Sequence, residues 1–174
     1  DTQGRITGHF GVQRDVTEQR HIVHVLEDHE HFLATLNDIT QAALETPDLP
    51  TMLQILADRT GELFNADGCY LTLWDEQAEM TVPTAAYGPM QETYPSQRSE
   101  PGEVTMTESV LRAGHPLVAE DVMNTPYLSP RIAAKYPTRS MLALPLIVGE
   151  RKLGAALVAF NTPHQFAEKE IQRG

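Results

Sequence analysis

The densest group of side chains capable of chemistry lies between residues 21 and 31, where four histidines alternate with apolar and acidic residues. On a helix, His24, Glu27, Asp28 and His31 share one face. Imidazole and carboxylate groups are suitable ligands for zinc or nickel. A solvated polar helix face has the same pattern, and the chain shows no fourth-ligand motif. We therefore predict no metal site.

Cys69 is the only cysteine of the chain, and it falls in the apolar run 69–74. A single thiol cannot cycle through an intramolecular disulfide, and no base or second cysteine lies nearby in the sequence. The simplest interpretation is a reduced, buried thiol, which agrees with a cytoplasmic location. His115 and His164 each flank a proline at a predicted turn, where a turn or surface role is favoured over haem ligation. We predict no catalytic residue.

Composition excludes several classes of protein. The chain has 174 residues, 41% of them hydrophobic, which suits one domain of about 130 residues with an extension. The net charge is −11, and the 13 basic residues are scattered, so we expect no nucleic-acid partner. No apolar run reaches the ~18 residues that span a bilayer, so we expect no direct membrane insertion.

The first long element predicted is a helix over residues 18–45, a segment without proline or glycine. Apolar side chains recur at Ile22, Leu26, Leu33 and Leu36, which suits an amphipathic helix. The apolar stripe is wider than a two-position seam, so the helix can contact both its own domain and a partner. We predict a homodimer through this helix.

The rest of the chain alternates between strand and helix patterns. Apolar spacing and turn residues predict a helix over 50–64, a strand over 69–74 with its partner at 80–87, and a surface loop over 88–102. A short helix over 109–114, a strand over 115–122 and a short helix over 131–136 follow. Residues 140–161 have two apolar runs around one short charged turn, which predicts a buried antiparallel hairpin.

This hairpin resembles the closing hairpin of GAF sensor domains, through Pro145-Leu146, the turn at Gly149-Glu150, and Leu153-Gly154. Residues 109–122 also resemble GAF domains, in which a short helix ending in glycine precedes a Pro-Leu strand and an acidic turn. The resemblance covers residues 30–174, with the terminal helix truncated. It implies an α+β fold related to PAS domains: an antiparallel sheet of about six strands, with helices on one face and a loop-covered cavity on the other.

The start of the chain resembles the end of a PAS domain. Asp15-Val16-Thr17 matches the junction at which the last PAS strand passes into a helix. We therefore interpret residues 1–17 as the tail of an upstream PAS domain, and residues 18–45 as a connecting, signalling helix that continues into the first GAF helix. The chain is expected to be a piece of a larger receptor.

The resemblance also suggests which residues border the cavity. The second strand, the acidic turn and the lid would surround one space, where tyrosines offer an apolar body with a polar tip and an arginine can pair with an anion. Core packing, turn capping or solvation would explain each of these residues equally well. The candidate ligand-binding residues are Tyr87, Asp121, Tyr127, Arg131 and Ser140.

Known GAF ligands fit the chain poorly. Cyclic-nucleotide-binding members have an Asn-Lys, Phe, Asp-Glu pattern, of which Asn161, Phe166 and Glu170 remain while Thr162 replaces the lysine. Bilin-binding members attach the pigment to a cysteine beside a histidine in the lid, and residues 126–137 have neither. We predict no cofactor, and leave a small-molecule ligand of unknown identity open.

These observations favour signalling over catalysis. We expect a regulatory, small-molecule-sensing GAF domain of a bacterial signal-transduction protein, in particular a sensor histidine kinase, that passes signals through dimeric helices to its output domain. Its partners would be a second copy and the adjacent PAS and output domains. The alternatives are a ligand-free dimerisation or spacer module, or the GAF domain of a cyclic-di-nucleotide enzyme or transcription activator.

Overall fold

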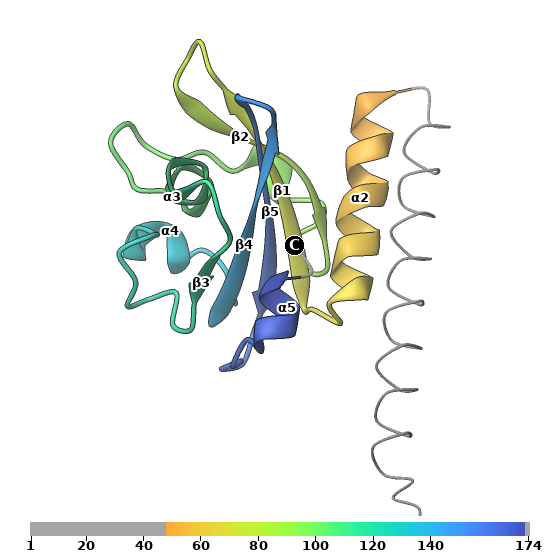
Figure 1. Ribbon diagram of the computed structural model, residues 1–174, viewed down its shortest axis with the longest axis vertical. Helices are drawn as coiled ribbons and strands as arrows, with labels where there is room; N and C mark the ends of the chain where they lie inside the picture. The colour runs from red at the N-terminus through yellow and green to blue at the C-terminus, as the bar shows by residue number, and fades with distance from the viewer. Residues whose placement is uncertain (1–47, 173–174) are drawn as a thin grey trace, which may run out of the picture. The chain divides into compact units, whose positions relative to one another are not determined.

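An antiparallel sheet of five strands, in the order β2-β1-β5-β4-β3, forms the centre of the computed structural model, which describes residues 48–172 (Figure 1). The strands are β1 (Gly68–Asp75), β2 (Met80–Tyr87), β3 (Leu117–Ala119), β4 (Ser140–Val148) and β5 (Arg151–Phe160). The helical elements are α2 (Leu49–Leu63), the 3-10 turn η1 (Tyr94–Ser96), α3 (Met106–Ala113), α4 (Pro130–Ala133) and α5 (Glu168–Gln172).

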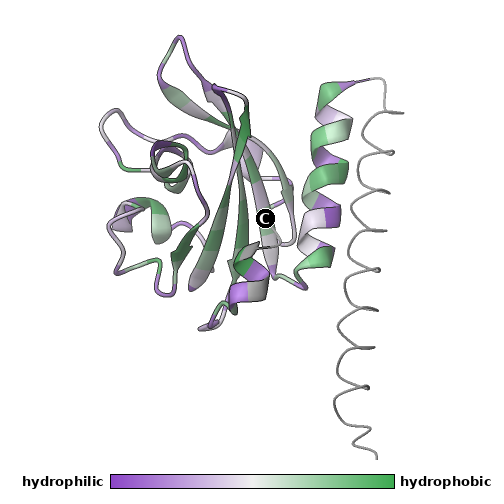
Figure 2. Ribbon diagram, viewed as in Figure 1, coloured by the Kyte–Doolittle hydropathy of each residue, from purple (hydrophilic) through white to green (hydrophobic). Residues whose placement is uncertain are grey.

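Helix α2 covers one face of the sheet (Figure 1). It begins where the Asp48 carboxylate accepts a hydrogen bond from the Thr51 backbone N–H at 2.8 Å, and Pro50 occupies its first turn. Its apolar side, which Figure 2 shows as a broken green stripe, buries Leu53 and Ala57 against the sheet. The spacing of four residues between these two positions explains why one side of the helix is buried.

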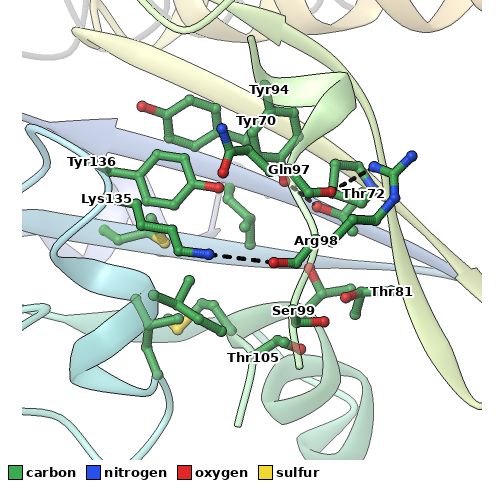
Figure 3. Close-up of a pocket in the computed structure, with 17 residues that line it drawn as sticks. Tyr70, Thr72, Thr81, Tyr94, Gln97, Arg98, Ser99, Thr105, Lys135 and Tyr136 are labelled. Carbon is green, nitrogen blue, oxygen red and sulfur yellow. Dashed lines mark hydrogen bonds between the residues drawn. The ribbon is translucent and has the colours of Figure 1, made fainter. Parts of the chain in front are cut away.

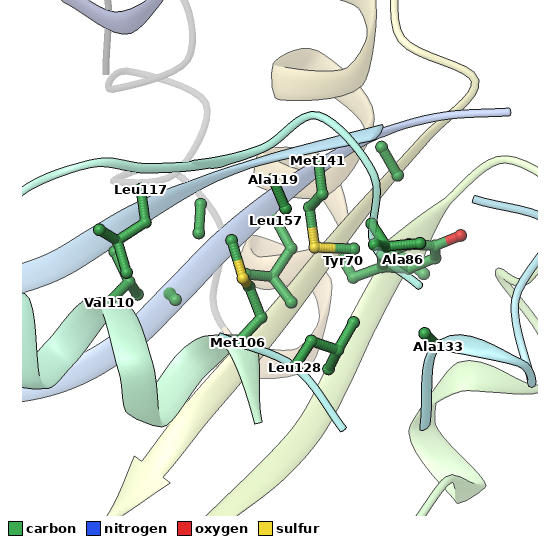
Figure 4. Packing of buried hydrophobic residues seen from close by; sticks show 14 of the residues in the cluster. Tyr70, Ala86, Met106, Val110, Leu117, Ala119, Leu128, Ala133, Met141 and Leu157 are labelled. Carbon is green, nitrogen blue, oxygen red and sulfur yellow. The ribbon is translucent and has the colours of Figure 1, made fainter. Parts of the chain in front are cut away.

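Side chains of the central strands alternate between two cores. In β1, Leu71 belongs to the helix-side core beneath α2, whereas Tyr70 belongs to the cavity-side core beneath α3 and α4. Figure 4 shows the cavity-side core, where Met106 of α3 meets Met141 and Leu157 of the sheet. Apolar residues therefore occupy both faces of β1, β4 and β5, as expected for strands covered on both sides.

The predicted fold class is confirmed. The strands predicted at 69–74 and 80–87 and the hairpin over 140–161 are present, and the described residues contain five strands where about six were expected. Helix α3 begins three residues earlier than predicted, because the Thr105 side chain accepts the Glu108 N–H and caps it. Gly114, with a φ of 71°, ends this helix as predicted.

Two short elements differ from their predicted lengths. Strand β3 has only three residues, which pair with Met141, Leu142 and Ala143 of β4, rather than extending over 115–122. Helix α4 ends at Ala133 rather than at residue 136. Beyond Ala133 the Lys135 and Tyr136 backbone N–H groups donate to carbonyls three residues earlier, and Pro137 disfavours the helical conformation at Tyr136.

Several predictions fall on residues 1–47, which lie outside the described residues. They are the PAS-like tail 1–17, the connecting helix 18–45, the dimer contact along it and the histidine-rich face at residues 21–31. Within residues 48–172, no helix has the length and apolar character that crossing a bilayer requires.

Candidate functional site

A cavity of about 70 Å³ lies on the face of the sheet opposite α2 (Figure 3). Tyr70 and Thr72 of β1 line it from the sheet, and Met106 lines it from α3. The segment that includes η1 and the segment around α4 close its sides. Its floor is mainly apolar and its rim is polar, which is the usual chemistry of a small-molecule site.

Three tyrosines form one wall of the cavity. The rings of Tyr70 and Tyr94 are stacked with centroids 4.9 Å apart, and the Tyr136 ring lies 5.4 Å from the first and 6.2 Å from the second. The hydroxyl groups of Tyr94 and Thr72 share a hydrogen bond at 2.5 Å. Burial raises the pKa of Tyr136 to about 12 and raises the pKa of the other two tyrosines, so all three phenols are neutral at ordinary pH.

The rim of the cavity carries two cations. Arg98 donates from Nη1 to the carbonyl oxygens of Pro95 and Gln97, at 2.8 and 2.6 Å. Lys135 donates from Nζ to the carbonyl oxygen of Arg98 at 3.3 Å, a bond that Figure 3 shows between the two segments on either side of the opening. Both cationic side chains are exposed to solvent.

A separate ion pair ties the same two segments together. Arg131 of α4 pairs with both carboxylate oxygens of Glu103 and, through Nη1, with Glu100 at 2.9 Å. The Ser129 backbone N–H donates to the Val104 carbonyl beside it at 2.8 Å. The hydrogen bonds from Arg131, followed by one from the Glu100 backbone N–H, lower the pKa of Glu103 to about 2.

None of the five predicted ligand-binding residues lines this cavity. Tyr87 lies on the helix-side core, where its ring contacts Gly61 of α2, so it is on the opposite face of the sheet. Tyr127 packs half-buried against the cavity-side core. Arg131 is engaged by Glu103 rather than directed into the cavity.

The remaining two predicted residues hold local structure. Asp121 is exposed, and its Oδ1 accepts the Met123 backbone N–H at 3.0 Å, which stabilises a turn. Ser140 is fully buried; its hydroxyl donates to the Glu120 carbonyl and accepts the His164 backbone N–H, both at 2.9 Å. The structure therefore does not bring the five residues together around one space.

The residues that do line the cavity were missed by the sequence analysis. Tyr70 and Thr72 had a usable signal, because residues at 70 and 72 of a strand share the face opposite Leu71. Tyr94 had none, since it is the buried residue of a loop that is otherwise polar and rich in proline. Lys135 lies in the segment expected to form the lid.

The reactive side chains outside the cavity have structural surroundings. Cys69 is buried in β1 as predicted, and burial raises the pKa of its thiol to about 12. The His164 ring stacks on Phe160 at 3.9 Å and its Nε2 lies 3.0 Å from Glu170. In the part of the chain that the structure describes, no three His, Cys, Asp or Glu side chains form a group suited to a metal ion.

Comparisons with known proteins agree with this architecture. The family model described as GAF domain matches residues 48–173. The GAF domain from a phosphoenolpyruvate-protein phosphotransferase of Coxiella burnetii is 25% identical, with a TM-score of 0.70 over 82% of this chain and 84% of that one. The corresponding Acinetobacter domain is 19% identical, with a TM-score of 0.68 over 82% and 85%.

A third solved structure is an enzyme, the free methionine-R-sulfoxide reductase from Neisseria meningitidis in complex with its substrate. It is 20% identical, with a TM-score of 0.65 over 82% of this chain and 80% of that one, a likeness in fold. A search of curated protein sequences gave no match.

Proposed function

The chain belongs to the GAF domain family, and we propose that it is the small-molecule-sensing regulatory domain of a bacterial signal-transduction protein. GAF domains serve as sensory and regulatory domains in signalling proteins. The observation that carries the proposal is the cavity on the sheet face opposite α2, which combines an apolar floor with a rim of polar groups. A cytoplasmic location is part of the proposal.

The central strand β1 connects the cavity to the other face of the sheet. Tyr70 and Thr72 of β1 line the cavity, while the intervening Leu71 packs beneath α2. A ligand that fits one arrangement of β1 better than another would shift the population between them, and α2 would respond through Leu71. The mechanism requires no catalytic residue.

We place this domain in a sensor histidine kinase, joined to an upstream PAS domain and to a C-terminal output domain. The PAS-like junction at residues 15–17 and the apolar stripe of residues 18–45 support this assignment. The stripe would form the homodimer contact. Replacing Leu26 and Leu36 with Glu should therefore give a folded monomer by size-exclusion chromatography with light scattering, and an unaltered dimer would contradict the contact.

A ligand-free spacer module is the second candidate. The observation in its favour is the size of the cavity, since about 70 Å³ is well below the ~300–1,000 Å³ of sites for drug-sized ligands. The two candidates differ in how their stability responds to a small molecule. A ligand that binds only the folded state of a sensor raises its free energy of unfolding, by about 2.7 kcal/mol at a ligand concentration of a hundred times Kd, whereas a spacer does not respond.

The test is a thermal-shift screen of the 174-residue chain with small metabolites of every charge class. Ser99 lines the cavity from a loop, so Ser99→Trp would fill the opening. Ser96→Trp is the matched control, because Ser96 is exposed at the end of η1 in the same segment and does not line the cavity. The proposal predicts that some compounds raise the Tm of the native chain and of Ser96→Trp but leave the Tm of Ser99→Trp unchanged. A screen without any such compound would contradict it and favour the spacer.

A further inference from the structure

The size of the cavity limits what it can bind. At about 70 Å³ it has room for a few water molecules or one small organic molecule. A nucleotide or a tetrapyrrole would require the segments that include η1 and α4 to separate completely. The closed arrangement, held by the Arg131 pairs with Glu103 and Glu100, favours a ligand of about one ring in size.

The tyrosine wall favours a planar, aromatic ligand. Tyr70 and Tyr94 stack on one another, and Tyr136 is tilted at 54° and 60° to them, so an aromatic ligand beside them would extend an existing cluster of aromatic contacts. Aromatic pairs in offset or edge-to-face contact strengthen binding by about two- to tenfold beyond the effect of their buried area. A saturated ring of the same size would gain only the free energy of burying its apolar surface.

The charge of the rim favours an anion. The whole chain has 24 acidic and 13 basic residues, yet the residues that line the cavity include Arg98 and Lys135 and no Asp or Glu. Within residues 48–172 neither of these cations takes part in an ion pair, although the Lys135 charge contributes to lowering the pKa of Glu103. The Lys135 ammonium donates once, to the Arg98 carbonyl, and an ammonium has three donors. It therefore retains capacity for a carboxylate.

Uncommitted polar groups complete the site. Among the described residues, neither the Tyr136 hydroxyl nor the Gln97 carboxamide has a hydrogen-bond partner, although both line the cavity. Tyr136 is adjacent in sequence to Lys135, and Figure 3 shows both side chains at the same side of the opening. A carboxylate held by Lys135 would have a phenolic donor within the same segment.

From this combination we infer that the ligand is a small aromatic carboxylate, with its ring against the tyrosine wall and its carboxylate at Lys135. The inference rests on the proposed function and narrows it to one chemical class. The tyrosines are neutral because burial raises their pKa values, so they do not repel the anion.

Isothermal titration of the 174-residue chain with three probes tests this assignment. The probes are benzoate, its neutral analogue benzamide, and cyclohexanecarboxylate, which keeps the charge without the aromatic ring. Benzamide lacks one exposed charge pair and cyclohexanecarboxylate lacks one aromatic contact. We therefore expect benzoate to bind about fivefold more tightly than either analogue. Lys135→Met should remove the preference for benzoate over benzamide, and Lys152→Met, on the exposed part of β5, should retain it.

The alternative outcomes separate the two proposals. Equal affinity for benzoate and benzamide, or for benzoate and cyclohexanecarboxylate, would overturn the aromatic carboxylate while leaving a functioning small-molecule site. An unchanged benzoate preference in Lys135→Met would overturn the role of the rim. Absence of binding by all three probes would also overturn the ligand class, whereas the sensing function itself fails only if the wider thermal-shift screen finds no ligand.

Discussion

Arg131 of α4 donates two parallel hydrogen bonds to Glu103, from Nε to Oε1 at 2.5 Å and from Nη2 to Oε2 at 2.6 Å. Glu103 lies in the loop before α3, so the pair joins two segments that border the cavity. The Glu103 side chain is 12% exposed, against 48% for Arg131. Bidentate pairing fixes geometry as well as charge, and it sets the position of α4 beside the cavity opening.

The pair should make stability depend on pH in the acid range. The pKa of Glu103 is lowered from 4.5 to about 2, so the unfolded chain binds the proton more readily than the folded one. The contribution of the pair to stability is therefore complete above pH 4.5 and is lost as the pH falls toward 2.

Urea unfolding should show native and Glu103→Gln proteins differing in stability above pH 4.5 and converging below it. A difference that does not change with pH would contradict this. Glu92→Gln, a charge change at an exposed residue away from the pair, is the control.

The hydrogen bond between Thr72 and Tyr94 should appear as an energetic coupling. Both side chains are at most 4% exposed, so removing one hydroxyl leaves the other buried without its partner. Tyr94→Phe and Thr72→Val should each cost about 1–3 kcal/mol of unfolding free energy. The double variant should lose less than the sum, because no polar group is then left unpaired. Strict additivity in chemical denaturation would show that the two hydroxyls do not interact.

Gly154 of β5 should not accept a side chain. A Cβ atom there would lie 2.1 Å from the Thr72 carbonyl oxygen of β1, and its φ of 154° is rare for other residues. Gly154→Ala should cost about 2–4 kcal/mol, from overpacking and backbone strain together. Gly102→Ala separates the two effects: its φ is 83° with nothing within 4 Å of the added atom, so it should cost only about 1 kcal/mol. Equal losses of Tm would contradict the steric account.

Cys69 should be inert in the folded protein. Burial raises the pKa of its thiol to about 12, so at mildly alkaline pH almost no thiolate is present, and the sulfur is also inaccessible. A chromogenic disulfide reagent should react with it at the rate of unfolding, and rapidly in denaturant. Stoichiometric labelling of the native chain within the mixing time would contradict the burial.

The fold was largely predictable because its signals are local. The hairpin over 140–161 has two long apolar runs with a single charged turn, and α2 follows a proline break with a strong helical period. Element ends were less predictable. They depend on single contacts, such as the cap that Thr105 provides to α3, and on how many residues of β3 find partners in β4.

The site was less predictable because it is assembled from distant segments. Tyr70 lies in β1, Tyr94 in the loop between β2 and α3, and Tyr136 after α4, so only the tertiary fold brings the three rings together. The five residues chosen from the resemblance depended on which side of the sheet each would face. Tyr87 illustrates the difficulty, because β1 and β2 change register between Leu71 and Thr72, and Tyr87 lies against α2.

The central claim is that a small molecule occupies the cavity opposite α2, and the methionine methyl groups report on it directly. Of the six methionines, Met106 and Met141 line the cavity, Met52 packs on the helix-side core and Met123 is exposed. Nuclear magnetic resonance of methyl-labelled methionine, recorded while a compound that raises the Tm is added, should show saturable shifts at Met106 and Met141 first. Shifts at Met123 alone, or none at either cavity methionine, would contradict the claim.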